Sequence, residues 1–273
     1  PELGLEYYLQ LIQAVRRQAR RLHLHFFSPA EIAHIGEVSS LKPEEVLQRF
    51  WDAGRRTMPG GGAEILVDRV RRQISPKKIR SQEWLDIMRA AHQLGMKTSA
   101  TMTYGHIESE EDIIEHLLRL RALQDETGGF YAFIPWSFKP GASPLALIRQ
   151  EEELPSYYVR IIAIARLVLD NFPHIQASWF GEGWRAGQLA LHGGADDFGG
   201  VLLEENVLFQ AQHQIAIRVE SVCHLIAEAG FEPVQRTTLY EEVHRYEMAG
   251  VPPAPPTIKR EPTMAGAFQK GNL

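Results

Sequence analysis

Polar side chains of the kinds that bind ligands follow several stretches that are predicted to be β-strands. Glu64 stands just after one such stretch, and Asp197 lies in another. Parallel strands end at a common edge of the sheet, where substrates and cofactors bind. We therefore expect a shared site at that edge. Its candidate residues are His23, His25, Glu64, Tyr104, His106, Glu108, Trp136, Ser137, Lys139, Gln176, Ser178, Asp196, Asp197, Glu204, Glu205 and Asn206.

The strongest local signal is a run of three glycines, Gly60, Gly61 and Gly62, with Glu64 two residues later. Glycine permits positive φ and brings backbone N–H groups close to a bound molecule. A carboxylate at the end of a strand can accept hydrogen bonds from ligand hydroxyls. The stretch predicts a ligand-binding loop, although a glycine-rich turn with a solvated Glu64 fits the same residues.

His23 and His25 stand two residues apart on a predicted strand, so both rings face the same side. With His106, His174 and Asp196 on later elements, they resemble the zinc layout of barrel amidohydrolases. The alternative is that these histidines line a pocket or bond to neighbouring strands.

A basic cluster follows the glycines. Its simplest interpretation is a solvated helix face and loop. A second interpretation is that one member attracts a carboxylate of the substrate. The cluster consists of Arg69, Arg71, Arg72, Lys77, Lys78 and Arg80.

Strand and helix patterns alternate six times between residues 22 and 198. Such alternation predicts an α/β fold in which helical crossovers join parallel strands, as in a (β/α) barrel. Right-handed connections are expected throughout. The predicted strands are Leu22–Phe27, Arg56–Met58, Lys97–Tyr104, Phe130–Trp136, His174–Trp179 and Ala195–Phe198.

The pattern changes after Gly200. A helix is predicted from about Gln212 to Ala229, and Pro233–Tyr240 is predicted to be extended. We therefore expect a barrel core over 1–200, a helical and extended extension packed on it over 201–248, and a flexible proline-rich tail over 249–273.

Composition excludes several classes of protein. The 273 residues are 44% hydrophobic and 23% charged, which is typical of a globular chain with a sizeable core. A net charge of -5 gives no reason to expect nucleic acid or an anionic membrane as a partner. The single cysteine, Cys223, excludes an intrachain disulfide framework and fits a reducing cytoplasm. No signal peptide or membrane-length apolar span is present.

Four longer strings carry a resemblance to a known family. They are Met58–Leu66 (MPGGGAEIL), Ile74–Lys78 (ISPKK), Ser99–Glu108 (SATMTYGHIE) and Leu117–Lys139 (LLRLRALQDETGGFYAFIPWSFK). Together they resemble dehypoxanthine futalosine cyclase, a radical S-adenosylmethionine enzyme of the futalosine route to menaquinone. Aminofutalosine synthase and the deazaflavin-forming F0 synthase subunits share much of the pattern, while ISPKK and the tryptophan of IPWSF favour the cyclase. The resemblance covers about residues 1–243.

The resemblance implies a barrel of the radical S-adenosylmethionine type, here expected without its first two strands. It implies S-adenosylmethionine and a [4Fe–4S] cluster as cofactors, a nucleoside-like substrate, and an electron donor such as flavodoxin or ferredoxin. The family's three cluster cysteines have no counterpart in this chain, so no metal ligand is assigned to it, and the cluster ligands are expected upstream of Pro1. We therefore expect a C-terminal part of a cyclase that is inactive by itself.

The resemblance also suggests roles for individual residues. Matched positions imply that Glu64 binds the cofactor ribose, beside Gly60, Gly61 and Gly62. They also imply that the backbone of Tyr104–Glu108, which includes His106, meets the adenine edge. Strand-end position makes His25, Ser28, Trp136, Gln176 and Ser178 candidates for the substrate side, with Asp197 and Glu205 as candidate catalytic groups. A zinc-dependent barrel hydrolase and a non-catalytic ligand-binding or partner-binding remnant are the rival functions.

Overall fold

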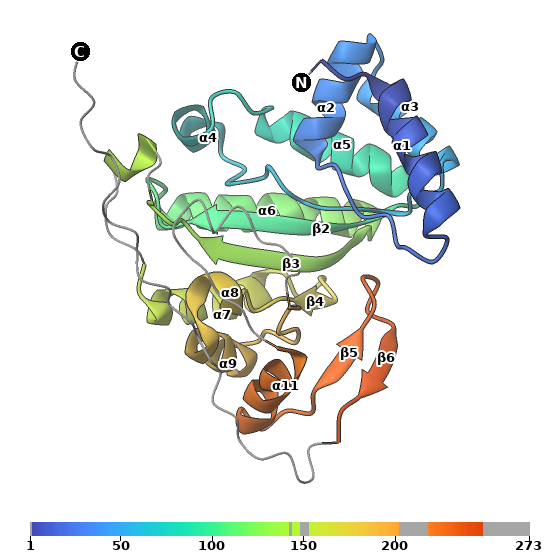
Figure 1. The fold of residues 1–273 in the computed structure, drawn as a ribbon. Helices are drawn as coiled ribbons and strands as arrows, with labels where there is room; N and C mark the ends of the chain where they lie inside the picture. The colour runs from blue at the N-terminus through green and yellow to red at the C-terminus, as the bar shows by residue number, and fades with distance from the viewer. Residues whose placement is uncertain (1, 142–143, 148–152, 202–217, 248–273) are drawn as a thin grey trace, which may run out of the picture.

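A parallel sheet of four strands runs through the middle of the computed structural model, which describes residues 2–141, 144–147, 153–201 and 218–247 (Figure 1). Its strand order follows the chain, and each strand is parallel to its neighbours. The strands are β1 (Thr57–Met58), β2 (Lys97–Tyr104), β3 (Phe130–Ser137) and β4 (His174–Ile175).

Two isolated parallel bridges extend this sheet at its two edges. His25 pairs with Thr57 of β1, and Gln176 pairs with Asp197. The predicted order and parallel direction of six extended segments are therefore confirmed. The predicted lengths of the first, fifth and sixth strands are wrong, because the first and sixth are single bridges and the fifth ends at Ile175.

Local geometry explains two of the shortened strands. Phe27 has a φ of 54°, which turns the chain out of the extended conformation directly before a helix begins. That helix starts with a capping box, in which Ser28 and Glu31 satisfy each other's backbone N–H groups. After β4, Trp179 already belongs to a helix, so the strand cannot continue to it.

Helices occupy the crossovers between the strands. In Figure 1, α6 runs behind β2, and α7 to α9 lie beyond β3. The described helices are α1 (Leu5–Gln18), α2 (Pro29–Ser39), α3 (Pro43–Asp52), α4 (Asp68–Ile74), α5 (Ser81–Gln93), α6 (Glu110–Thr127), α7 (Pro155–Val168), α8 (Trp179–Glu182), α9 (Trp184–His192) and α11 (Val219–Glu228), with a 3₁₀ turn at Pro144–Leu147. Within the described ranges, none of these helices combines the length and hydropathy that a membrane span requires.

The two faces of β2 differ in chemistry because side chains alternate along a strand. Ala100, Met102 and Tyr104 are fully buried in the hydrophobic core. Ser99 and Thr101 alternate with them and bond to the backbone of the glycine loop. The sheet thus presents an apolar face to the helices and a hydroxyl-rich face on its other side.

The C-terminal part packs against the start of β4 through a short hairpin. Strands β5 (Val234–Arg236) and β6 (Glu242–Arg245) are antiparallel, and the turn between them carries Tyr240. The Tyr240 ring stacks on His174 with a centroid distance of 3.6 Å. The expected domain boundary near residue 200 stays a prediction, and the expected tail lies outside the described residues.

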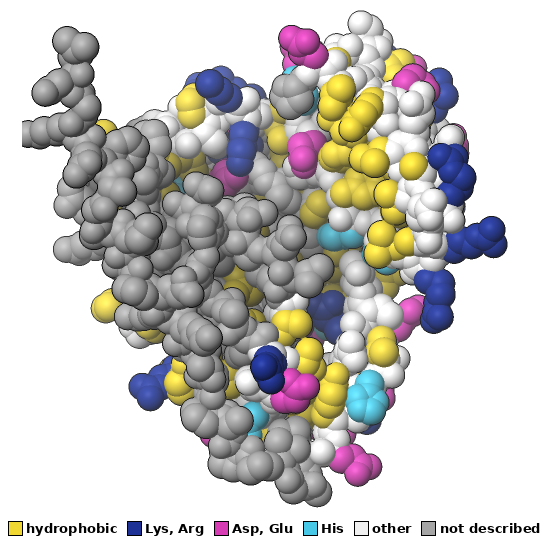
Figure 2. Space-filling model, viewed as in Figure 1, with side chains coloured by type: hydrophobic (Ala, Val, Ile, Leu, Met, Phe, Trp, Pro, Cys, Tyr) yellow, Lys and Arg dark blue, Asp and Glu magenta, His cyan; other side chains and the backbone are white. Residues whose placement is uncertain are grey.

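Exposed apolar side chains gather over α1, at the upper right of Figure 2. Leu3, Tyr7 and Leu11 are about half exposed. The nearby segment at His25 is paired with Thr57 on one side, and the described residues contain no strand that pairs with its other side. Among the described residues, this side of the sheet is therefore an open edge.

Buried neutral histidines predict that acid weakens the fold. Burial, together with nearby positive charges, lowers the pKa of His92 to about 4 and of His116 to about 3. Between these values and the unfolded pKa of about 6.5, only the unfolded chain takes up the protons, so stability falls as pH falls. Each histidine then contributes up to about 1.4 kcal/mol per pH unit.

Chemical denaturation at pH 7, 6 and 5 measures this slope. His92→Gln, which can still bond to Thr98 and Thr127 but cannot titrate, is expected to flatten the slope. His34→Gln, at an exposed position of α2, is the matched histidine-to-glutamine control for the substitution itself. Equal stability at pH 7 and pH 5 would contradict the prediction.

Candidate functional site

The glycine loop lies against the edge of β2 at the point where β1 ends. The Gly60 N–H donates to Ser99 Oγ at 3.0 Å, and the Gly60 carbonyl accepts from Thr101 Oγ1 at 2.7 Å. A Cβ on Gly60 would stand 2.3 Å from the Ser99 carbonyl oxygen. Gly60 is therefore required for close packing between neighbouring segments, whereas Gly62 supplies a positive φ of 76°.

A buried guanidinium fixes the shape of this loop. Arg71 is 2% exposed and donates to the carbonyls of Gly62, Ala63 and Ile65. It also donates to the carbonyl of Ile79 at 2.6 Å. The interpretation of the basic cluster as a solvated face is thus wrong for Arg71, whose charge is spent on backbone oxygens inside the protein.

Glu64 has a strained backbone and a well-held carboxylate. Its φ is 46°, in the left-handed region that a residue with a Cβ seldom adopts. Oε2 accepts from Thr103 Oγ1 at 2.9 Å, and Oε1 pairs with the Lys78 ammonium. Burial alone would raise the pKa of Glu64, but Lys78 and Thr103 outweigh burial and lower it. The carboxylate is therefore ionised at neutral pH.

This carboxylate can still accept bonds from a ligand. A carboxylate offers about four lone-pair positions, and the two donors found among the described residues use two of them. The Glu64 side chain is 21% exposed, so part of it can be reached from solvent. Two acceptor oxygens at the carboxyl edge of the sheet match the two neighbouring hydroxyls of a ribose.

Trp136 joins the same network from the end of β3. Its Nε1–H donates to Thr103 Oγ1 at 2.8 Å, and Thr103 and Trp136 face each other in the register of β2 and β3. The structure thus brings together Glu64, which was expected to bind the cofactor, and Trp136, which was expected to bind the substrate. Thr103, which joins them, was not among the candidate residues.

Ser28 and His25 lie at the adjoining edge. A Cβ on Gly61 would touch the Ser28 side chain at 3.4 Å, so the start of α2 and the glycine loop are neighbours. His25 Nδ1 lies 2.9 Å from Thr57 Oγ1. Burial, with the nearby Arg55 and His23, lowers the pKa of His25 to about 4, so its ring is neutral at pH 7.

Side chains of the turn after β2 form hydrogen bonds within that turn. The buried carboxylate of Glu108 accepts the N–H groups of Gly105 and His106. His106 Nε2 donates to the Thr103 carbonyl at 3.0 Å. Tyr104 is buried on the helix side, where its hydroxyl has no partner among the described residues. The Tyr104 side chain is buried and the His106 side chain is bonded within the turn. The contact expected with an adenine edge would therefore be made by the backbone of these residues.

Two further candidates, Gln176 and Ser178, have contact partners other than Glu64. Ser178 is fully buried, and its N–H donates to Tyr158 Oη at 2.6 Å. Gln176 pairs with Asp197 in the last bridge of the sheet. Glu205 lies outside the described residues.

Asp197 is fully engaged by the C-terminal hairpin. It pairs with Arg236 and accepts from Tyr240 Oη at 2.6 Å, while its other oxygen accepts the Gly199 N–H. It lines a cavity of about 630 Å³ beside α11 and β5, which no residue of the glycine loop lines. These contacts join the barrel to the C-terminal extension.

The histidines of the zinc alternative do not converge. His23 and His25 both bond to Thr57, His106 belongs to its own turn, and His174 pairs with Asp196. Among the residues that the structure describes, no group of three or more His, Cys, Asp or Glu side chains is arranged to hold a metal ion. The zinc hydrolase reading is wrong on this geometry.

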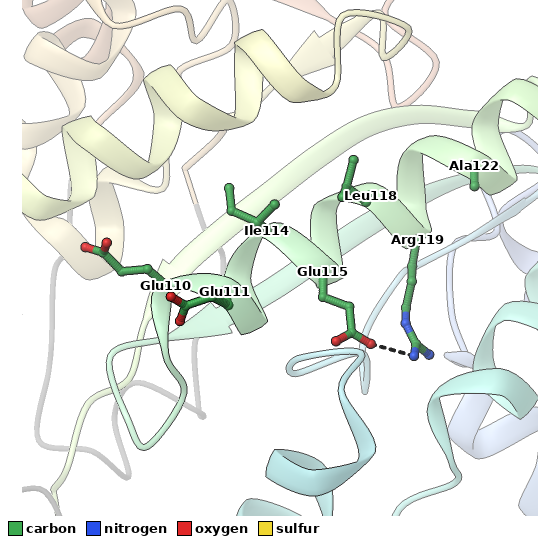
Figure 3. A pocket seen from close by; sticks show the side chains of 7 residues that line it. All are labelled: Glu110, Glu111, Ile114, Glu115, Leu118, Arg119 and Ala122. Carbon is green, nitrogen blue, oxygen red and sulfur yellow. Dashed lines mark hydrogen bonds and ion pairs between the residues drawn. The ribbon is translucent and has the colours of Figure 1, made fainter.

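A separate hollow of about 570 Å³ lies on the outer face of α6 (Figure 3). Residues of this one helix line it, and its Glu115 and Arg119 pair with each other. No strand end contributes to it, so it is not part of the candidate site. Its lining residues are Glu110, Glu111, Ile114, Glu115, Leu118, Arg119 and Ala122.

Comparison with known proteins gives the family. Residues 1–120 match the radical S-adenosylmethionine superfamily, and residues 127–248 match the CofH/MqnC C-terminal region. A Methanopyrus kandleri protein, 5-amino-6-(D-ribitylamino)uracil–L-tyrosine 4-hydroxyphenyl transferase, is 41% identical over 90% of this chain and 68% of its own length. This chain belongs to the radical S-adenosylmethionine superfamily of enzymes.

Other relatives in this superfamily carry different names. The cyclic dehypoxanthine futalosine synthase of Halalkalibacterium halodurans is 41% identical over 90% of this chain and 66% of that relative. The aminodeoxyfutalosine synthase of Thermus thermophilus is 40% identical over 90% of this chain and 68% of that relative. The chain thus spans about two thirds of the length of these relatives.

A solved structure supports the barrel fold. Methylornithine synthase aligns with a TM-score of 0.55 at 18% identity, over 76% of this chain and 63% of that chain. At this identity the likeness concerns the fold alone. The fold is the (β/α) barrel type of the superfamily, as expected from the sequence.

The superfamily's two cofactors fit these residues differently. Glu64 offers an ionised, partly exposed carboxylate at the strand edge, which suits the ribose of S-adenosylmethionine. The [4Fe–4S] cluster is held by several cysteine thiolates. This chain contains only Cys223, buried on α11, so its own residues do not form a cluster site.

The neighbouring glycines give a matched test of the loop geometry. Gly60→Ala forces a Cβ against the Ser99 carbonyl and should destabilise the fold by about 1–3 kcal/mol, the usual cost of overpacking. Gly61→Ala meets only an ordinary contact with Ser28 and should cost less than about 1 kcal/mol. Urea unfolding of both variants measures the difference. Equal losses at the two positions would show that the loop does not pack in this way.

Proposed function

We propose that this chain carries the ribose-binding and substrate-binding face of a radical S-adenosylmethionine enzyme that cyclises dehypoxanthine futalosine in menaquinone biosynthesis. The observation that carries the proposal is the position of Glu64. Its ionised carboxylate lies at the carboxyl edge of the sheet, beside Trp136 and the glycine loop. The ISPKK and IPWSF strings favour the cyclase, and a cyclic dehypoxanthine futalosine synthase is among the relatives at 41% identity.

The residues would divide the work by position. Glu64 would accept hydrogen bonds from the cofactor ribose, and the backbone after β2 would meet the adenine edge. Trp136 would offer an aromatic surface to the substrate, and neutral His25 a hydrogen-bonding group. Ser28, Gln176 and Ser178 stay proposals for the substrate side, as Asp197 and Glu205 do for proton transfer.

The bound cofactors of this superfamily supply a 5′-deoxyadenosyl radical that removes a hydrogen atom from the substrate. The protein's part is to orient the reacting atoms and to keep water away from them. An electron donor such as flavodoxin or ferredoxin is part of the proposal.

A second function is favoured by the equal identity of the Methanopyrus kandleri relative, whose name specifies transfer of a 4-hydroxyphenyl group from L-tyrosine to 5-amino-6-(D-ribitylamino)uracil. Aminodeoxyfutalosine synthase is a third possibility within the same superfamily. The test uses a protein that joins this chain to the cluster segment of a relative. Incubation with each substrate set, followed by mass spectrometry, should give the cyclic dehypoxanthine futalosine product. Formation of the uracil–tyrosine product instead would overturn the assignment.

Glu64→Gln tests the ribose contact without requiring turnover. Removing the charge should weaken binding of S-adenosylhomocysteine by about 1.5–3 kcal/mol, the scale of a hydrogen bond to a charged group. Isothermal titration calorimetry measures the loss, and the unfolding midpoint reports on the fold. Glu111→Gln, exposed on α6, is the matched control and should bind normally. Unchanged affinity in Glu64→Gln would leave Glu64 as a residue of a turn.

The polypeptide of these 273 residues is expected to hold no [4Fe–4S] cluster by itself. A single buried cysteine cannot supply the several thiolates that a cluster requires. Iron and sulfide analysis after anaerobic reconstitution checks this expectation. Four irons per chain would contradict it, and the joined protein described above provides the positive control.

A further inference from the structure

Glu64 stands at the centre of a hydrogen-bonded chain whose direction is fixed by chemistry. The Trp136 indole can only donate, and it donates to Thr103 Oγ1 at 2.8 Å. An ionised carboxylate can only accept, so the Thr103 hydroxyl must donate its one hydrogen to Glu64 Oε2 at 2.9 Å. Trp136 thus determines which way the Thr103 hydroxyl points, and Thr103 fixes one oxygen of Glu64.

The other oxygen is held by Lys78, which approaches from a different segment. Glu64 Oε1 pairs with the Lys78 ammonium, and Lys78 lies in the turn after α4. The turn is closed by a hydrogen bond from the Lys78 N–H to the Ser75 carbonyl at 3.0 Å. Two donors on opposite sides of the carboxylate therefore restrict its rotation.

One buried side chain places both of the segments that meet in this ion pair. Arg71 donates to the carbonyls of Gly62 and Ala63, next to Glu64, and to the carbonyl of Ile79, next to Lys78. Because a single guanidinium holds both segments, Glu64 and Lys78 are brought together by the fold. They do not meet merely by the chance approach of two surface side chains.

We propose that Lys78 and Thr103 are positioning residues that hold the Glu64 carboxylate in the orientation needed to accept both hydroxyls of a ribose. This inference rests on the proposed function, because it gives Glu64 the ribose of an adenosine-type ligand. Neither residue needs to touch that ligand. They act through Glu64, by occupying one lone-pair position on each oxygen and leaving the others directed outward.

The exposure of Lys78 indicates that its ion pair serves to position Glu64 more than to stabilise the fold. Its side chain is 42% exposed, and ion pairs at that exposure add little to folding stability. Lys78→Met should therefore shift the unfolding midpoint by less than about 3 °C. Its effect on ligand affinity should be larger, since an untethered carboxylate must lose rotational freedom when it binds the ribose.

The experiment compares two nucleosides that differ by one hydroxyl. Calorimetry at pH 7 gives the affinities of 5′-deoxyadenosine and of 2′,5′-dideoxyadenosine for the chain and its variants. Lys78→Met and Thr103→Val should each weaken 5′-deoxyadenosine binding by about five- to tenfold, the scale of one ordinary hydrogen bond. The dideoxy probe should change by less than about twofold.

Conservative variants are expected to retain ligand binding, which separates a positioning role from a merely structural one. Lys78→Arg keeps the positive charge and Thr103→Ser keeps the hydroxyl, so both should retain binding within about twofold of the unsubstituted chain. If Thr103→Val does not fold, Lys78→Met alone carries the test.

Two outcomes overturn the inference in distinguishable ways. If the unsubstituted chain prefers the diol probe but Lys78→Met and Thr103→Val bind it equally well, the positioning role is wrong and the ribose contact stands. If the unsubstituted chain shows no preference between the two probes, the ribose contact itself fails, and the positioning role fails with it.

Discussion

The buried Arg71 guanidinium is the interaction on which the candidate site depends. It donates hydrogen bonds to carbonyl oxygens of the glycine loop and of the turn after α4, which are separate segments of the chain. A buried cation is costly unless its donors are satisfied, and here backbone oxygens satisfy them. This one group holds the segments that carry Glu64 and Lys78.

The β2 strand links the hydrophobic core to the site because its two faces have different tasks. Met102 and Tyr104 are fully buried in the core, while Ser99 and Thr101 hold Gly60 and Thr103 holds Glu64. Movement of this strand would therefore disturb the loop and the carboxylate together. The rigid packing of β2 explains how a short polar network at the sheet edge keeps one geometry.

The sequence predicts the order and direction of the strands because the patterns of strands and helices are local. Their alternation along the chain indicates parallel strands joined by helices. The sequence also indicates Glu64 and Trp136, because each stands at or just after the end of a predicted β-strand. It does not find Arg71 or Lys78, since a cluster of basic residues carries no sign of which member turns inward. Thr103 was detectable in principle from the period-two series Ser99, Thr101 and Thr103. The engagement of Asp197 by Arg236 and Tyr240 depends on contacts between distant segments, which local patterns do not encode.

A crystal structure of the protein with S-adenosylhomocysteine tests most directly whether Glu64 is the ribose-binding carboxylate. The expected result is a ribose with both hydroxyls about 3 Å from the Glu64 oxygens, with Lys78 and Thr103 still bonded to that carboxylate. The adenine is expected beside the backbone that follows β2. A nucleoside bound elsewhere, with Glu64 contacting only Lys78 and Thr103, would contradict the proposed site.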